Sequence, residues 1–155
     1  MNNFNAEHYL DPTPTEALKH IEDARRVQSL SRLTETGLLI VLKGVPPSMN
    51  HFAGRANQKE YWEAKEQWTA LIAAVVGRNR PLIPFGRAVV RITYRFKNHI
   101  RRDPDNYCGK LLIDGLTKSG VIKDDSFACI ELRLRAENEA GPERTVIEVI
   151  ERREP

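Results

Sequence analysis

The amino-acid sequence predicts an α+β domain: a mixed sheet of about four strands covered by two helices, in the order β-α-β-α-β-β, with an appended N-terminal helix. Helical spacing of apolar residues, or helix start and stop signals, mark residues 57–76 and 106–119. Short runs rich in Val, Ile and Leu, bounded by turn residues, predict strands at 37–44, 88–96, 128–136 and 145–151. A chain of 155 residues that is 41% hydrophobic and 29% charged fits one globular domain.

The first 36 residues are expected to form an extension to the domain at 37–155. Asp11-Pro12-Thr13-Pro14-Thr15 is a turn, and Thr15 is a candidate N-cap for a helix from Glu16 to about Leu33. The apolar stripe of this helix is thin, so we expect it to dock on a partner or to fray. Residues 37–44 then form a short apolar strand bounded by glycines, which is typical of a strand buried in a sheet.

The two prolines of Val45-Pro46-Pro47-Ser48-Met49-Asn50 predict a non-helical connector, because proline fixes φ and lacks an N–H donor. The helix at 57–76 follows, with apolar residues along one side. Its tryptophans, Trp62 and Trp68, are expected to anchor the core and not to form a base-stacking platform.

The segment at 88–96 alternates, which predicts a strand with one buried face. Gly120 is expected to end the second helix. Two further strands, joined by a turn near Ala140-Gly141-Pro142, close the chain, and the alternation at 145–151 leaves the buried face of the last strand open.

Composition and charge narrow the functional classes. No apolar run approaches the roughly 18 residues of a membrane span, and no secretory signal is visible. Cys108 and Cys129 lack CxxC spacing, so a zinc site is not expected. We expect a soluble protein of the reducing cytoplasm. The net charge is +3, but residues 87–110 hold seven basic and two acidic side chains. This stretch predicts a surface that attracts phosphate; a solvated strand face is the alternative.

The segment Asp103-Pro104-Asp105 carries the strongest chemical signal. Pro104 disfavours the α region at Asp103, so the segment is expected to be extended and to project both carboxylates to one side. Two carboxylates held close together repel each other unless a cation or a proton neutralises one of them. Hard oxygen ligands of this kind suit Mg²⁺ or Mn²⁺. The alternative is structural: Asp105 caps the following helix, and Asp103 is a turn residue.

Charged residues further along the chain extend this pattern. Lys110 and Asp114 share a face of the second helix, and Lys110 can reach back toward a phosphate near Asp103 and Asp105. Asp124 and Asp125 follow that helix, and a third carboxylate from their loop would complete a set for one or two divalent ions. Flanking phosphates would be positioned by Arg101 and Arg102, and more distantly by Lys97 and Arg95.

Together these motifs resemble the RusA family of Holliday-junction resolvases, which are small, often prophage-associated endonucleases. The similar segments are Arg101-Arg102-Asp103-x-Asp105-Asn106, Lys110-x-x-x-Asp114-x-Leu116-Thr117-Lys118-x-Gly120, Asp124-Asp125 and the upstream Pro46-Pro47-Ser48-x-Asn50. The resemblance implies a homodimeric, Mg²⁺-dependent endonuclease of DNA recombination and repair that cuts four-way junctions. It implies metal-binding roles for Asp103, Asp105 and Asp125, a phosphate contact for Lys110, DNA contacts including Lys118, and lower-ranked places for Asp114 and Asp124.

Other classes remain to be distinguished. A non-catalytic or differently specific branched-DNA-binding protein would use the same basic stretch, and its binding would respond to salt but not to EDTA. A nucleotide-sugar transferase of the DxD type is disfavoured by the length of the chain. No phosphate-binding GxxxxGK[ST] loop and no nucleophile with a partnering histidine motif is present. His51 and His99 are expected to be solvent-exposed and not catalytic.

Overall fold

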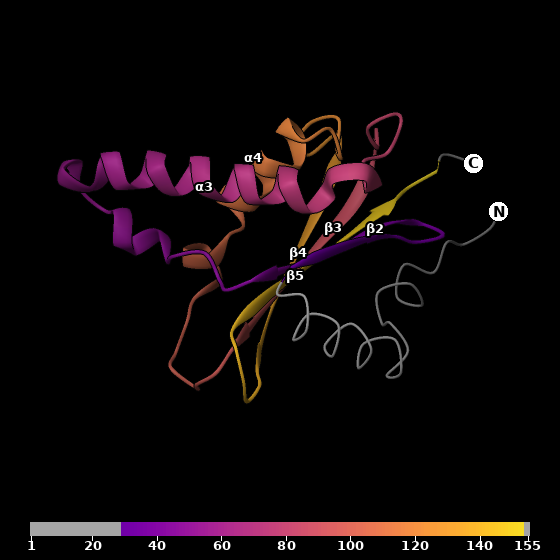
Figure 1. Ribbon diagram of the computed structural model, residues 1–155. Helices are drawn as coiled ribbons and strands as arrows, with labels where there is room; N and C mark the ends of the chain where they lie inside the picture. Colours follow the sequence, from indigo (N-terminus) through magenta and orange to yellow (C-terminus); the bar gives the residue numbers. More distant parts are fainter. Residues whose placement is uncertain (1–28, 154–155) are drawn as a thin grey trace.

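A single five-stranded mixed sheet organises the protein, whose computed structural model describes residues 29–153 (Figure 1). The strand order is β1-β2-β5-β3-β4; the β3–β4 pair is parallel and the other pairs are antiparallel. The strands are β1 (Leu30–Leu33), β2 (Gly37–Lys43), β3 (Ala88–Phe96), β4 (Ile130–Asn138) and β5 (Arg144–Glu151). The predicted α+β class and the mixed sheet are confirmed.

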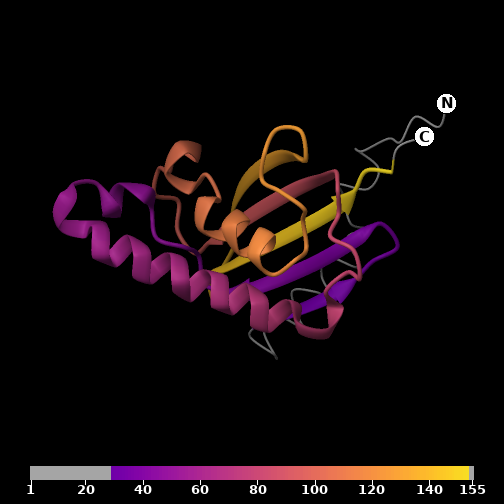
Figure 2. The same cartoon turned by 90° about the horizontal axis from the view of Figure 1, so that it is seen from above.

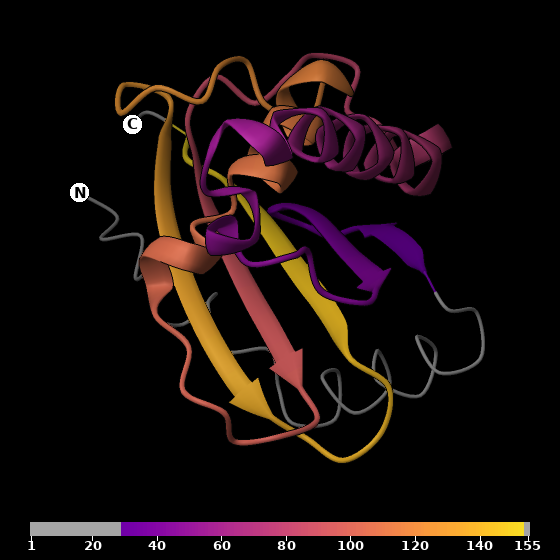
Figure 3. The same cartoon turned by 90° about the vertical axis from the view of Figure 1, so that its left-hand side faces the viewer.

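Both helices lie on one face of this sheet, as Figures 2 and 3 show from two directions. They are α3 (Gln58–Val76) and α4 (Lys110–Lys118), and α4 connects the parallel strands β3 and β4. Four 3₁₀ turns complete the described elements: η1 (Met49–Phe52), η2 (Arg55–Asn57), η3 (Gly77–Asn79) and η4 (Pro104–Tyr107). No helix within residues 29–153 is both long enough and apolar enough to cross a membrane.

The main core fills the space between the sheet and the two helices. Ile40, Ile92 and Ile147 from three strands are fully buried against Ile72 of α3. The helices approach closely at Gly115 of α4, where an added Cβ would lie 2.8 Å from Cδ1 of Ile72. The core therefore fixes α4, and with it the segments on either side of α4, to the sheet.

The strand β1 corrects one prediction. Residues 30–33, expected as the end of a helix, instead pair with β2, and the amide of Asn79 donates to the Ser31 carbonyl at 3.1 Å. The sheet therefore has one more strand than expected. The earlier part of the predicted helix, with most of the predicted extension, lies outside the described residues.

Trp62 corrects a second prediction, because its side chain points to solvent. Trp62 is 57% exposed, whereas Trp68 is partly buried and packs against the core. Ala64, Ile72 and Val76 are the buried residues of α3. The helix therefore uses the 64–68–72 side for the core and leaves Trp62 outside it.

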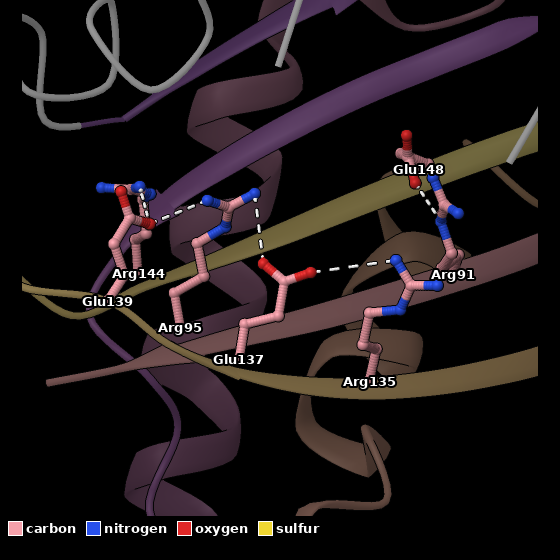
Figure 4. Close-up of polar contacts among 7 residues, drawn as sticks. All are labelled: Arg91, Arg95, Arg135, Glu137, Glu139, Arg144 and Glu148. Atoms are coloured by element: carbon pink, nitrogen blue, oxygen red, sulfur yellow. Dashed lines mark hydrogen bonds and ion pairs between the residues drawn. The ribbon is translucent and has the colours of Figure 1, made fainter. Parts of the chain in front are cut away.

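The second face of the sheet is polar but buried over β3, which corrects the expectation of one buried face. Arg91 is 6% exposed and pairs with Glu148, its cross-strand neighbour on β5 (Figure 4). Arg95 forms ion pairs with Glu137 at 3.5 Å and Glu139 at 2.8 Å. Burial opposes ionisation of Glu139, but hydrogen bonds and charges from arginines including Arg95 lower its pKa overall. Carboxylates from neighbouring strands thus neutralise the basic residues of β3.

Candidate functional site

The Asp103-Pro104-Asp105 segment is a bend and not an extended run. Asp103 has extended φ/ψ values of −104° and 139°, and Pro104 then begins η4, which places Asp105 in a 3₁₀ turn. The strand-like alternation that was predicted to bring the carboxylates together is therefore wrong, because it ends at Asp103. Both aspartates are exposed, and Asp103 accepts a hydrogen bond from the Arg101 guanidinium at 3.2 Å.

An aromatic cluster beneath η4 holds this bend in place. The rings of Tyr94 and Phe96 on β3 lie 5.7 and 5.3 Å from the ring of Tyr107. Burial raises the pKa of the Tyr94 hydroxyl, so Tyr94 stays neutral and packs as part of the core. Arg102 lies over the Phe96 ring, 3.7 Å from its centroid, and donates to the Ile100 carbonyl at 2.9 Å. Arg102, predicted to contact DNA, thus also anchors the loop that carries Asp103.

Gly109 begins α4 and brings Lys110 next to η4. Gly109 has φ of +79°, which glycine adopts without strain, and an added Cβ would lie 2.6 Å from Cδ1 of Ile92. Gly109, not Asp105, is therefore the N-cap, so the predicted capping role of Asp105 is wrong for α4. The first turn has no acidic residue and no side-chain cap, and Lys110 is exposed there. This helix end favours anions.

A second segment singled out in the sequence, the connector at 45–50, meets the first in space. The connector at 45–50 leads into η1, which packs beside η4 (Figure 3). Pro46 and Pro47 line the same small cavity as Asn106 and Lys110. The Ser48 hydroxyl accepts a hydrogen bond from the Asn50 amide at 3.3 Å, which stabilises the connector. Sequence reasoning identified each motif, but no local signal indicated that the two are neighbours.

Asp124 and Asp125 lie beyond the other end of α4. Hydrogen bonds from the Ser126 hydroxyl and from the Asp125 amide lower the pKa of Asp124, so Asp124 takes part in the hydrogen bonding of its own turn. Asp125 is exposed on the rim of a depression of about 570 Å³ that Ala88 and Ile130 also line.

Within one chain the predicted carboxylates do not converge. Asp103 borders Leu134 and Ala136 on β4, whereas Asp125 lies near Ile130, four to six residues earlier. At ~3.3 Å per residue this separation is on the order of 15 Å. Among residues 29–153, no group of three or more His, Cys, Asp or Glu side chains is arranged to hold a metal ion. The predicted convergence of Asp103, Asp105 and Asp125 is therefore not seen in the single chain.

The remaining candidates divide between structural and exposed positions. Asp114 forms a part-buried salt bridge of 3.1 Å with Lys65, which ties α4 to α3. Arg95 is held by glutamates, with 16% of its side chain exposed. Lys97, Arg101 and Lys118 are exposed. The phosphate-attracting charge predicted for 87–110 therefore lies on the loop after β3 and on α4, and not on β3 itself.

Both histidines singled out by the sequence are exposed, as expected. His51 shares a hydrogen bond of 3.0 Å with Glu60, and that pair lies at the surface. No protein-family model matches the chain, and no curated protein matches it either. Function must therefore be inferred from the residues and their placement.

The exposed carboxylates of Asp103 and Asp105 are hard oxygen donors, the ligand type that Mg²⁺ prefers. Mg²⁺ keeps several waters and is commonly bound through one or two protein carboxylates. Asp103 shares its oxygen with an arginine that is itself 89% exposed, a weak contact that a divalent ion can displace.

Proposed function

We propose that the protein is a Mg²⁺-dependent endonuclease that cuts branched DNA, with four-way junctions as its substrate. The observation that carries this proposal is the assembly of two distant motifs into one exposed ledge. The connector at 45–50 and the η4 segment lie side by side, with Asp103, Asp105 and Lys110 open to solvent. The resemblance to junction resolvases rests in part on these same residues.

In this proposal each residue of the ledge has a task. Asp103 and Asp105 would hold a divalent ion, which when bound would activate water and stabilise charge on phosphoryl oxygens. Lys110 binds the scissile phosphate at the start of α4, where the helix end adds positive potential. Arg101 and Lys97 position neighbouring phosphates without reading sequence.

A homodimer explains the separate position of Asp125. Two cuts placed symmetrically on a four-way junction require two sites related by a two-fold axis. Asp125 lies at the far end of α4 from Asp103, so within one chain it is too distant to share an ion with Asp103. We propose that Asp125 of each chain completes the site of its partner. The alternative is that Asp103 and Asp105 hold the ion alone.

The direct test uses a labelled four-way junction beside a linear duplex of equal length. The full-length protein should nick or resolve the junction in Mg²⁺, leave the duplex largely uncut, and stop cutting when EDTA is added. Asp103→Asn should bind the junction as well as the unmodified protein and cut at least about 100-fold more slowly, because a charged metal ligand is lost.

Two outcomes would contradict the proposal. If the protein binds the junction but EDTA changes nothing and no strand is cut, it is a binding protein. If Asp103→Asn cuts at the unmodified rate, the assignment of Asp103 as a metal ligand is wrong. Asp114→Asn is the matched control, because Asp114 lies in a helix–helix salt bridge; its effect should appear in thermal stability.

A further inference from the structure

A groove is lined by residues of α3 and of the C-terminal end of α4. Its volume is about 450 Å³, within the range of small-ligand sites. Trp62 lies at this groove, small residues such as Ala70 and Ala73 line it, and Lys118 borders it on α4. Trp62 is 57% exposed, which is unusual for a tryptophan on a packed helix.

A run of aromatic rings links this groove to the proposed active site. His51 and Phe52, Phe52 and Tyr61, and Tyr61 and Trp62 form edge-to-face pairs with centroids 5.1–5.6 Å apart. The run begins in η1, which packs beside η4 with its candidate metal ligands. The aromatic surface therefore extends from the ledge along α3 to Trp62.

Two lysines of α4 accompany this aromatic surface. Lys110, Asp114 and Lys118 recur every four residues, so they follow one side of the helix, with about 12 Å between the two lysines at ~1.5 Å rise per residue. Asp114 is matched by Lys65, which also lies 5.0 Å from the Trp62 ring centroid. Lys118 forms no salt bridge within residues 29–153, so its charge remains available to a phosphate.

We infer that the groove between Trp62 and Lys118 binds an unstacked nucleotide of the DNA strand that is cut at the ledge. The base stacks on Trp62, and Lys118 contacts its phosphate. Proteins that hold single-stranded nucleic acid combine these features, an aromatic platform and a cationic track beside it. The inference rests on the proposed function, because it assigns a subsite to the same substrate.

The chemistry of the groove indicates which kind of ligand binds there. Glu66 is the one carboxylate among the residues that line it, against Lys65 and Lys118. A base presents a flat π-face to Trp62, and its phosphate complements Lys118. A second copy of this chain, docking a helix into the groove, is the competing occupant, and the experiment below distinguishes it.

The test isolates the emission of Trp62. The chain has two tryptophans, so Trp68→Phe leaves Trp62 as the single reporter, and Asp103→Asn keeps the DNA intact. Titration of this full-length variant with oligo(dT), and with a four-way junction, should quench the tryptophan emission at saturation. Intact linear duplex, whose bases are stacked and paired, should quench it much less.

Three substitutions then measure the contribution of each side chain. Trp62→Ala should weaken oligo(dT) binding by about 5- to 150-fold, the range of one base–aromatic stack, whereas Trp62→Phe should keep most of the affinity. Lys118→Ala should weaken binding and reduce the salt dependence by about one ion. Leu82→Ala is the matched control, since Leu82 is fully exposed on a loop away from the groove and should change neither.

The results separate failure of this inference from failure of the proposed function. In one outcome the protein cuts junctions, although DNA does not change the emission of Trp62 and the Trp62→Ala variant binds normally. That result would contradict the subsite and leave the proposed nuclease activity standing. If the protein binds oligo(dT) through Trp62 but never cuts DNA, the subsite is supported and the proposed nuclease activity is wrong. If Trp62→Ala instead changes the oligomeric state in solution, the groove is a contact between copies and the inference is wrong.

Discussion

The basic residues of β3 and those of α4 are alike in the sequence, but in the structure they differ in burial and in ion pairing. Arg91 and Arg95 are largely buried and held by glutamates of β4, β5 and the turn between them (Figure 4). Lys110 and Lys118 are exposed at the two ends of α4 and form no salt bridge within the described part of the chain. Net charge along a segment therefore does not predict which of its basic side chains remain open to solvent.

The cause of this difference is the register of the sheet. Arg91 lies directly opposite Glu148, and Arg95 directly opposite Glu137, so each arginine meets a carboxylate that is distant in sequence. An isolated helix surface has no such neighbouring strand, and its terminal lysines stay in water. The arginines of β3 are neutralised within the fold, whereas the lysines at the two ends of α4 remain exposed.

The largest expected effect is on folding and comes from Arg91. Arg91→Met removes one member of a buried pair and leaves Glu148 without its partner, so the free energy of unfolding should fall by about 3–5 kcal/mol. Denaturant titration measures this value. Lys59→Ala, which breaks an exposed pair with Glu63, should cost no more than about 0.5 kcal/mol.

One result would contradict this contrast between β3 and α4. If Arg91→Met folds with unchanged stability and its DNA binding becomes less sensitive to salt, Arg91 contacts phosphate and β3 belongs to the binding surface. The double substitution Arg91→Met with Glu148→Leu provides a further check, because removing both charges should recover much of the lost stability.

Substitution of Lys110 should have a slightly smaller effect than substitution of Arg91, and that effect should be on catalysis and not on stability. Lys110→Ala should lower kcat by about 100- to 1,000-fold, as expected for loss of one charge that stabilises the transition state, while the Kd for the junction changes by a few fold. Single-turnover cleavage and equilibrium binding measure the two quantities. Lys110→Arg should recover part of the rate. An unchanged kcat in Lys110→Ala would place the phosphate elsewhere.

Sequence reasoning predicted the elements with strong periodicity. The helix at 57–76 and the strand at 88–96 were found within one residue, because each has a long pattern of a single period. The end of α4 was also predictable, since Gly120 adopts φ of +76° after the helix. Asp103 and Lys110 of the ledge were also named from the sequence, and their functional roles stay a prediction.

The parts that failed depend on contacts between distant segments. Tyr61 and Trp62 are adjacent on a helix, and spacing alone could not indicate that Trp62 faces solvent. The strand at 30–33 is formed by pairing with β2, which a local pattern does not encode. The start of α4 was misplaced because Asn106 follows a proline-containing acidic segment that resembles a cap, whereas Gly109 makes the turn by packing against Ile92. The separation of Asp103 and Asp125 follows from the crossover through α4.

The central claim, that Asp103 of one chain and Asp125 of another form one site, is tested most directly by complementation. Asp103→Asn and Asp125→Asn chains with different tags are co-expressed, and the heterodimer is isolated through both tags. Each homodimer lacks an intact site. The heterodimer should regain one of its two sites and nick the junction on one strand, because the intact Asp103 and the intact Asp125 belong to different chains that meet. A heterodimer as inactive as either homodimer would contradict the claim.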